Sequence, residues 1–178
     1  MKFEELSLSG AYLIHFDPFQ DHRGSFSRIF CQEAFKREGL EHHFSQVNIS
    51  FNKSKNTLRG LHFQISPYEE VKLISCTKGS VFDVIVDLRK DSKTYGKWQS
   101  VELSQKCSQA LYVPKNFAHG FKTREDESEL LYLISSPYIQ NAAAGIYWRD
   151  PTLKIEWPDG PPILSSRDSE LPKFTEVF

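Results

Sequence analysis

The sequence lacks the features that mark several large classes of protein. Lysine and arginine total 22 against 23 aspartate and glutamate residues, so no basic surface for nucleic acid or anionic lipid is indicated. No apolar run approaches the roughly 18 residues that a membrane-spanning helix needs. Acidic residues stand near the N-terminus where a signal peptide is basic, and no hydrophobic segment follows. We predict a soluble, cytoplasmic protein with no nucleic-acid or membrane partner.

Cysteine is also scarce. The three cysteines, Cys31, Cys76 and Cys107, are odd in number and show no paired metal-binding spacing. This pattern favours an intracellular protein with reduced thiols. A glycine-rich dinucleotide loop is missing as well, so no nucleotide redox cofactor is indicated.

Aromatic residues, by contrast, are abundant. The 178 residues include 14 phenylalanines and seven tyrosines, a composition that suits a β architecture. The length fits one domain with a sizeable core. We see no internal repeat or domain boundary and predict a single domain over residues 1–178.

Short alternating segments separated by glycine and proline dominate the chain. They predict strands at residues 10–16, 25–30, 44–51, 71–76, 80–88, 98–103, 110–113 and 129–134. Residues 32–39 are the best helix candidate, and a proline-rich tail from about residue 150 is expected to wrap the surface. The pattern predicts an all-β, antiparallel jelly-roll barrel or sandwich with minor helices and a core at about residues 40–140.

The segment Thr57–Gln64 combines a cation, a glycine and an imidazole in four residues. In a regular strand, His62 and Gln64 share one face and Arg59 lies on the other. A polar pair on one face would line a cavity instead of a dry core. One histidine in a β-strand is more often structural than catalytic, so the segment alone does not decide between a structural and a catalytic role for His62.

Four other polar residues interrupt apolar segments, and each has an ordinary structural interpretation. Lys72 is either an edge lysine that blocks aggregation or a cation directed into a cavity. His119 follows a turn at the start of a strand, and Tyr132 is either a core tyrosine or a functional phenol. Asp168 is either a helix cap or a surface charge.

Taken together, these segments resemble the dTDP-4-dehydrorhamnose 3,5-epimerase family over nearly the whole chain. The matching stretches are 21–24, 46–50, 59–64, 72, 82–89, 117–121, 132, 155–158 and 164–168. The resemblance implies a cupin-type jelly roll and a homodimer that exchanges N-terminal strands. It implies a cofactor-independent epimerase that inverts carbon-3, carbon-5 or both in a nucleotide-diphosphate-linked 4-keto-6-deoxy sugar, within activated deoxysugar and surface polysaccharide biosynthesis.

The resemblance also implies the roles of individual residues. His62 is the expected base, oriented by Asp168, while Lys72 stabilises the enolate and Tyr132 returns a proton on the opposite face. No metal is expected. The residues expected to bind substrate are Arg23, Arg28, Gln46, Asn48, Arg59, His119, Tyr138 and Arg167, with Arg23 and Arg59 at the diphosphate.

Two departures from the family pattern leave the nucleotide open. Arg28 and Ala144 stand where the family commonly has acidic residues. The alternatives are therefore a 3-epimerase or ketoisomerase that acts on a GDP- or CDP-linked 4-keto sugar. A metal-binding cupin is a further alternative, although Gln64 replaces the second histidine of a His-x-His pair, with Glu69 or Glu70 and His119 only roughly placed.

Overall fold

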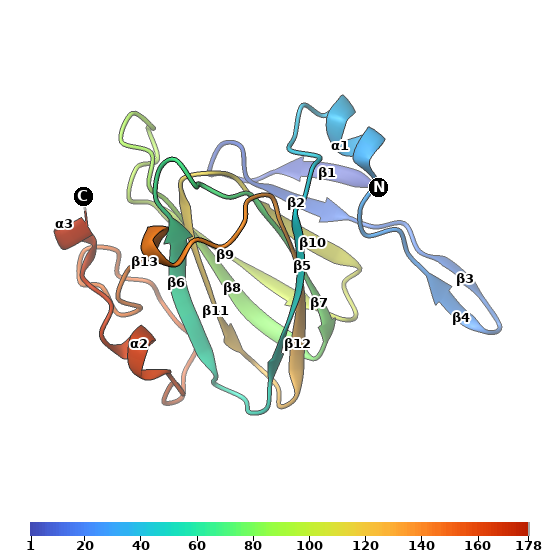
Figure 1. The fold of residues 1–178 in the computed structure, drawn as a ribbon. Coiled ribbons are helices and arrows are strands. Elements are labelled where there is room, and N and C mark those ends of the chain that lie inside the picture. The colour runs from blue at the N-terminus through green and yellow to red at the C-terminus, as the bar shows by residue number, and fades with distance from the viewer. Residues whose placement is uncertain (178) are drawn as a thin grey trace.

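A computed structural model describes residues 1–177 and shows two antiparallel β-sheets packed face to face (Figure 1). The six-stranded sheet has the order β1-β2-β10-β7-β12-β5. Its strands are β1 (Lys2–Glu5), β2 (Tyr12–His15), β10 (Gln109–Val113), β7 (Lys72–Lys78), β12 (Ser128–Ile134) and β5 (Gln46–Asn52). The sheet therefore includes β1 and β2, which precede the expected start of the core near residue 40.

The five-stranded sheet has the order β13-β6-β11-β8-β9. Its strands are β13 (Ala143–Gly145), β6 (Leu58–Gln64), β11 (Phe117–Thr123), β8 (Ser80–Asp87) and β9 (Trp98–Ser104). Every strand pair in both sheets is antiparallel. The predicted all-β, cupin-like jelly roll is confirmed.

Strand β8 shows why the smaller sheet sits between two apolar layers. Val81 and Ile85 pack between the sheets, whereas Val84 and Val86 pack on the opposite face. Successive strand residues point to opposite faces, so a strand buried on both sides is an almost continuous apolar run. Asp83 and Asp87 interrupt that run, and both are fully buried.

The C-terminal tail packs on the outer face of the smaller sheet. It contributes Leu153 and Phe174 to the outer core and carries two short helices, α2 (Ser166–Ser169) and α3 (Phe174–Val177). The buried Lys122 of β11 secures it by donating to the carbonyl oxygens of Pro158 at 2.6 Å and Gly160 at 2.7 Å. The tail thereby brings α2 to the edge of the jelly roll.

Two other helical segments are equally short. Helix α1 (Gln32–Arg37) occupies most of the predicted helix and buries Phe35 against the outer face of the larger sheet. A 3-10 turn, η1 (Gln140–Ala142), precedes β13. Within residues 1–177, no helix has the length and apolar character required to cross a membrane.

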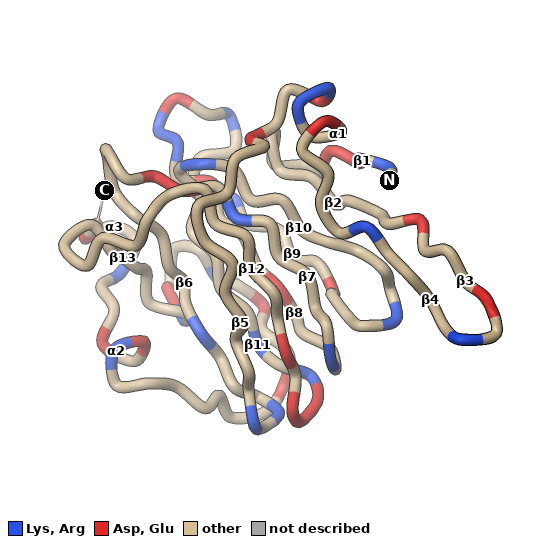
Figure 2. The backbone as a smooth tube through the Cα atoms, turned by 45° about the vertical axis from the view of Figure 1, so that its right-hand side comes forward, with Lys and Arg blue, Asp and Glu red and all other residues tan. Residues whose placement is uncertain are grey.

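A two-stranded arm projects from the body of the molecule (Figure 1, Figure 2). It consists of β3 (Phe19–Asp21) and β4 (Gly24–Phe26), with Phe19 67% and Phe26 75% exposed. The prediction of a strand over residues 25–30 is wrong beyond Phe26. The chain leaves the hairpin there and runs without strand partners to Cys31, the N-cap residue of α1.

Candidate active site

A cavity of about 420 Å³ opens between the two sheets at the end where β5, β6 and β13 lie. Its wall combines side chains from the larger sheet, the smaller sheet and the C-terminal tail. The lining residues include Gln46, Asn48, Ser50, Arg59, His62, Gln64, Glu70, Lys72, His119, Tyr132, Tyr138, Ala144 and Arg167. Nine of the twelve residues expected at the site line this cavity, and a tenth, Asp168, bonds to the lining residue His62.

A β-bulge in β6 corrects one prediction about these side chains. Arg59 was expected on the face opposite His62, yet both line the cavity. The ladder with β11 pairs His62 with His119 and Arg59 with Phe121, so Gly60 and Leu61 together oppose Gly120. The extra residue reverses the alternation of faces. A Cβ at Gly60, whose φ is +115°, would lie 2.7 Å from the Gly120 Cα atom, so the bulge requires glycine.

His62 forms a dyad with Asp168 of α2. Its Nε2 lies 2.6 Å from Asp168 Oδ1, and the carboxylate is buried while the imidazole is about one-third exposed. Because a carboxylate only accepts, Nε2 carries the hydrogen and Nδ1 is the nitrogen with a free lone pair. Burial acts to raise the pKa of Asp168, but the hydrogen bond and charge of His62 hold it below its usual value, helped by the Gly60 backbone and Ser165.

Lys72 is directed into the cavity and does not lie at a sheet edge. Its strand, β7, has β10 on one side and β12 on the other, which removes the edge-lysine interpretation. The ammonium lies 3.0 Å from Glu70 Oε1 and donates to the carbonyl oxygen of His62 at 3.1 Å. A nearly buried cation is thus held at the backbone of His62, on the wall of the same cavity.

Tyr132 lines the opposite wall, on β12. Burial raises the pKa of its phenol well above the usual value; the Asp83 carboxylate adds to the rise, and the Arg59 guanidinium opposes it. The phenol therefore stays protonated over the neutral range. Its ring packs edge-to-face against the imidazole of His119, with centroids 5.9 Å apart.

Asp83 belongs to the site but was not identified from sequence. It is fully buried on β8, and both of its oxygens lie within 3.0 Å of His119 Nε2. Burial raises the pKa of Asp83, while the charges of His119 and Lys72 act against that rise. An aspartate in the apolar run of residues 81–86 was the available signal, since buried charges need partners.

Arg59 is held by the neighbouring strand. Its Nε donates to Asn52 Oδ1 at 2.8 Å, and the buried Asn52 amide donates in turn to the carbonyl oxygens of Ser50 and Ser128. The Arg59 Nη2 also donates to the carbonyl oxygen of Phe51 at 3.5 Å. These bonds fix one edge of the guanidinium and leave its other N–H groups for an anion. Three cationic side chains line the cavity: Arg59, Lys72 and Arg167. Among the described residues, Glu70 is the one carboxylate in the lining, so the cavity carries an excess of positive charge.

The two arginines near the N-terminus do not reach this cavity. Arg23 is exposed at the tip of the arm, paired with Asp21 at 2.6 Å. Arg28 lines a second cavity, about 580 Å³, between the base of the arm and α1. Arg23 lies in the turn between β3 and β4, and Arg28 follows β4 by two residues.

The donor set in the cavity does not fit a cupin metal site. Gln64, at the position of the missing second histidine, donates to Glu70 and to two carbonyl oxygens, while its own oxygen accepts from the Ile139 amide. Glu70, the possible carboxylate ligand, is bonded to Gln64 and paired with the Lys72 ammonium at 3.0 Å. A neutral amide and a carboxylate paired with a cation therefore stand where a cupin metal site has a second histidine and a free glutamate.

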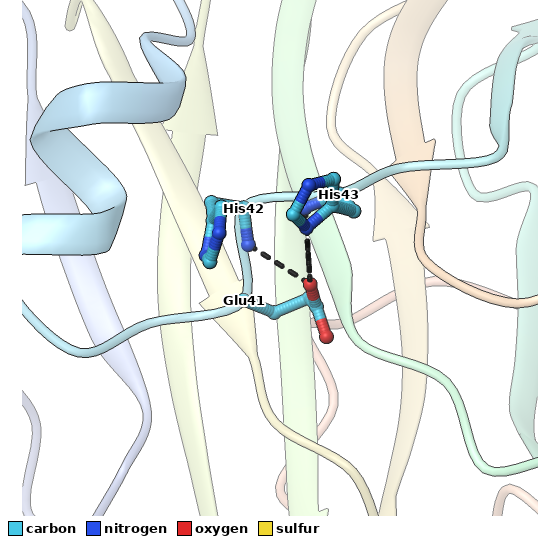
Figure 3. Close-up of side chains that lie close together, drawn as sticks. All are labelled: Glu41, His42 and His43. Atoms are coloured by element: carbon cyan, nitrogen blue, oxygen red, sulfur yellow. Dashed lines mark hydrogen bonds and ion pairs between the residues drawn. The ribbon is translucent and has the colours of Figure 1, made fainter.

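Within residues 1–177, one group of three side chains lies close enough together to hold a metal ion, and it lies outside the cavity. Glu41, His42 and His43 have ligand atoms within 4.8 Å of one another in the loop before β5 (Figure 3). Glu41 Oε1 accepts the backbone N–H groups of both histidines at 3.0 Å. These local bonds account for the arrangement as a turn.

Comparison with known proteins decides the family. The family model described as dTDP-4-dehydrorhamnose 3,5-epimerase matches residues 5–176. The chain belongs to this family. The dTDP-4-dehydrorhamnose 3,5-epimerase of Sinorhizobium fredii is 40% identical, covering 99% of this chain and 91% of the relative. That of Escherichia coli strain K12 is 44% identical, covering 90% and 87%.

Solved structures of family members agree with the fold. The Bacillus anthracis epimerase, determined with TDP and PPi bound, has a TM-score of 0.95 and 39% identity, covering 97% of this chain and 99% of the other. ChmJ, a 3'-monoepimerase from Streptomyces bikiniensis in complex with dTDP-quinovose, has a TM-score of 0.91 and 32% identity, covering 97% and 87%. This member of the dTDP-4-dehydrorhamnose 3,5-epimerase family is a sugar-nucleotide epimerase.

Proposed function

We propose that this epimerase inverts a carbon beside the ketone of a nucleotide-linked 4-keto-6-deoxy sugar by removing and returning a proton. The Nδ1 atom of His62 takes the proton from the carbon, and the electron pair of the broken C–H bond moves to the ketone oxygen. Asp168 holds the imidazole in the required tautomer and stabilises the imidazolium that forms. The Lys72 ammonium donates to the enolate oxygen.

Tyr132 completes the inversion by giving its phenolic proton to the same carbon from the opposite side. The electron pair returns from the enolate oxygen to re-form the ketone, and Tyr132 becomes a phenolate. Arg59, whose charge lowers the pKa of this phenol, favours that phenolate. A proton passed back from the imidazolium through solvent then resets both groups.

The observation that carries this proposal is the placement of the two proton-transfer groups on facing sheets. His62 lies on β6 of the five-stranded sheet, and Tyr132 lies on β12 of the six-stranded sheet. Both line the same cavity. A sugar bound between the sheets would meet the base on one face and the acid on the other, which is the condition for inversion.

The substrate class follows from the cations and from the relatives. Arg59, Lys72 and Arg167 line the cavity, and guanidinium groups suit a diphosphate. Solved relatives bind dTDP-4-keto-L-rhamnose and dTDP-quinovose, which supports a nucleoside-diphosphate 4-keto sugar as substrate. The curated relatives at 40–44% identity are named 3,5-epimerases, so we propose inversion at both carbon-3 and carbon-5; inversion at carbon-3 alone, as the name of ChmJ states for that relative, is the alternative.

We further propose that the protein acts as a homodimer in which each arm serves the partner's site. Arg23 and Arg28 lie away from their own cavity, and Phe19 and Phe26 of the arm are largely exposed. An apolar, projecting hairpin is stabilised by covering it with another surface. In this structure β1 and β2 pair within their own chain, so the segment we propose for exchange is the β3–β4 arm.

Deuterium exchange in heavy water tests the proton path. His62→Asn should abolish deuterium uptake at the carbons beside the ketone, because no proton leaves. Tyr132→Phe keeps the ring and should still allow uptake, but the proton should return to its original face, giving exchange without inversion. The two variants therefore separate the first step from the last.

The assay follows both processes in one sample, with deuterium measured by mass spectrometry and inversion by proton NMR. Tyr147→Phe removes a phenol that does not line the cavity and serves as the control for loss of a hydroxyl. Full epimerisation by His62→Asn would contradict the mechanism. Loss of exchange in Tyr132→Phe equal to that in His62→Asn would remove Tyr132 from the role of acid.

A further inference from the structure

A carboxylate on the cavity wall, Glu70, has no role in the reaction described above. Its Oε1 lies 3.0 Å from the Lys72 ammonium, and its Oε2 accepts from the Gln64 amide at 3.0 Å. The Lys72 and Glu70 side chains are 8% and 11% exposed. Each oxygen of this nearly buried carboxylate thus has its own fixed partner.

The bonds to Lys72 determine where the ammonium points. An ammonium has three N–H donors, and here one faces Glu70 while another is donated to the His62 carbonyl oxygen at 3.1 Å. Since the three N–H bonds are tetrahedrally disposed, fixing two sets the direction of the third. Lys72 lines the cavity, so the remaining donor is available to a bound substrate.

The bond to Gln64 fixes the carboxylate itself. The two N–H groups of Gln64 Nε2 are shared between Glu70 and the carbonyl oxygens of Tyr68 and Pro137, at 3.0, 3.0 and 3.1 Å, and Gln64 Oε1 accepts from the Ile139 amide at 2.7 Å. The amide cannot turn over without breaking these bonds. The orientation of Glu70 is therefore imposed by both the loop after β6 and the loop that carries Tyr138.

We propose that Glu70 is a positioning residue that aims the Lys72 ammonium at the enolate oxygen. The inference rests on the proposed role of Lys72. Charge develops on that oxygen only as the proton leaves, so a misdirected ammonium weakens the transition state more than the bound substrate. Loss of Glu70 should therefore lower kcat and leave KM nearly unchanged.

Substitution of Glu70 by glutamine is a sharp perturbation at this position. If its oxygen faces Lys72, its amide nitrogen faces the Gln64 amide nitrogen, and two donors meet. Gln64 cannot relieve the conflict by turning over, because its oxygen is held by the Ile139 amide. Glu70→Gln thus removes the charge and the geometry with almost no change in volume.

A double-mutant cycle tests the proposal. Removal of one oxyanion donor typically costs about 10²–10³ in kcat, so we expect that loss for Lys72→Met and a smaller one, roughly 10- to 100-fold, for Glu70→Gln. In the Lys72→Met background, Glu70→Gln should have almost no further effect, since it acts through the lysine. Glu69→Gln makes the same charge change one residue earlier and is the matched control. Melting temperatures establish that all variants fold.

The outcomes separate the two proposals. Full activity in Lys72→Met would overturn the role of Lys72 and, with it, that of Glu70. Loss in Lys72→Met combined with wild-type kcat in Glu70→Gln would overturn only the positioning role. Losses that multiply in the double variant, or a Glu70→Gln defect confined to KM, would likewise show that Glu70 does not act by aiming the ammonium.

Discussion

The His62–Asp168 pair offers the most direct test of the base. Replacing Asp168 by asparagine keeps the shape of the side chain and removes its charge. The side-chain oxygen of Asp168 lies 2.6 Å from Nε2, and its backbone N–H caps α2 through Ser165. The substitution retains the backbone N–H that Ser165 caps, so the helix should survive, although the side chain at position 168 also interacts with Ser165 and with the Gly60 backbone.

The expected loss of catalytic rate follows from how an asparagine amide, placed 2.6 Å from the imidazole, would interact with His62. With its nitrogen toward His62, asparagine donates to Nε2 and stabilises the tautomer that carries hydrogen on Nδ1, which then cannot accept a proton. With its oxygen toward His62, the tautomer is retained but the imidazolium loses its counter-charge. A comparable aspartate-to-asparagine change in a serine protease costs about 10⁴ in kcat. We expect two to four orders of magnitude here, because the imidazole is partly exposed and solvent screens part of the charge.

The rate of deuterium uptake measures this loss directly, since it reports proton removal without requiring inversion. Asp168→Asn should reduce uptake and epimerisation by the same factor, with nucleotide affinity unchanged. Glu170→Gln, a charge change just after α2, is the control and should be within about twofold of wild type, as expected for a surface substitution. Uptake at the wild-type rate in Asp168→Asn would refute the dyad.

Two further predictions concern the parts of the site beyond proton transfer. Ala144 lines the cavity, at a position where the family commonly has an acidic residue. Ala144→Glu should therefore change the ratio of inhibition by free dTDP and CDP by about tenfold or more, which is about 1.4 kcal/mol. An unchanged ratio would show that this position does not select the nucleotide. If the arm serves the partner's site, mixing inactive Arg23→Ala and His62→Asn proteins should restore activity, because one site of each mixed dimer is then intact. No gain in activity after subunit exchange, verified by native mass spectrometry, would refute arm sharing.

Much of the fold was predictable because the alternation of polar and apolar residues, and the turn residues between strands, can be read from short segments of sequence. Alternation identified the strand that carries Gln46, Asn48 and Ser50, and all three line the cavity together. The arm was misjudged because Ser27 and Arg28 continue an alternating pattern although no strand lies beside them to pair. Periodicity describes which face a residue would occupy, but pairing depends on the neighbour that tertiary structure supplies.

The partners of the cavity side chains were not predictable from local pattern. Asp83, Glu70 and Asn52 contact His119, Lys72 and Arg59 respectively. Asp83 and His119 are 36 residues apart in sequence and meet because β8 and β11 are adjacent in the sheet. Such contacts depend on strand order, which the sequence alone does not specify.

The prediction that Arg59 lies on the strand face opposite His62 was wrong, and a single residue accounts for the error. Regular alternation would direct the guanidinium away from His62, and a diphosphate could not then contact Arg59 while the attached sugar contacts the base. The bulge at Gly60 and Leu61 brings both side chains to the cavity. It is possible only because Gly60 lets the backbones of β6 and β11 approach within a distance that any Cβ would block. The glycine between the cation and the imidazole therefore lets one strand present both Arg59 and His62 to the cavity, as their proposed roles require.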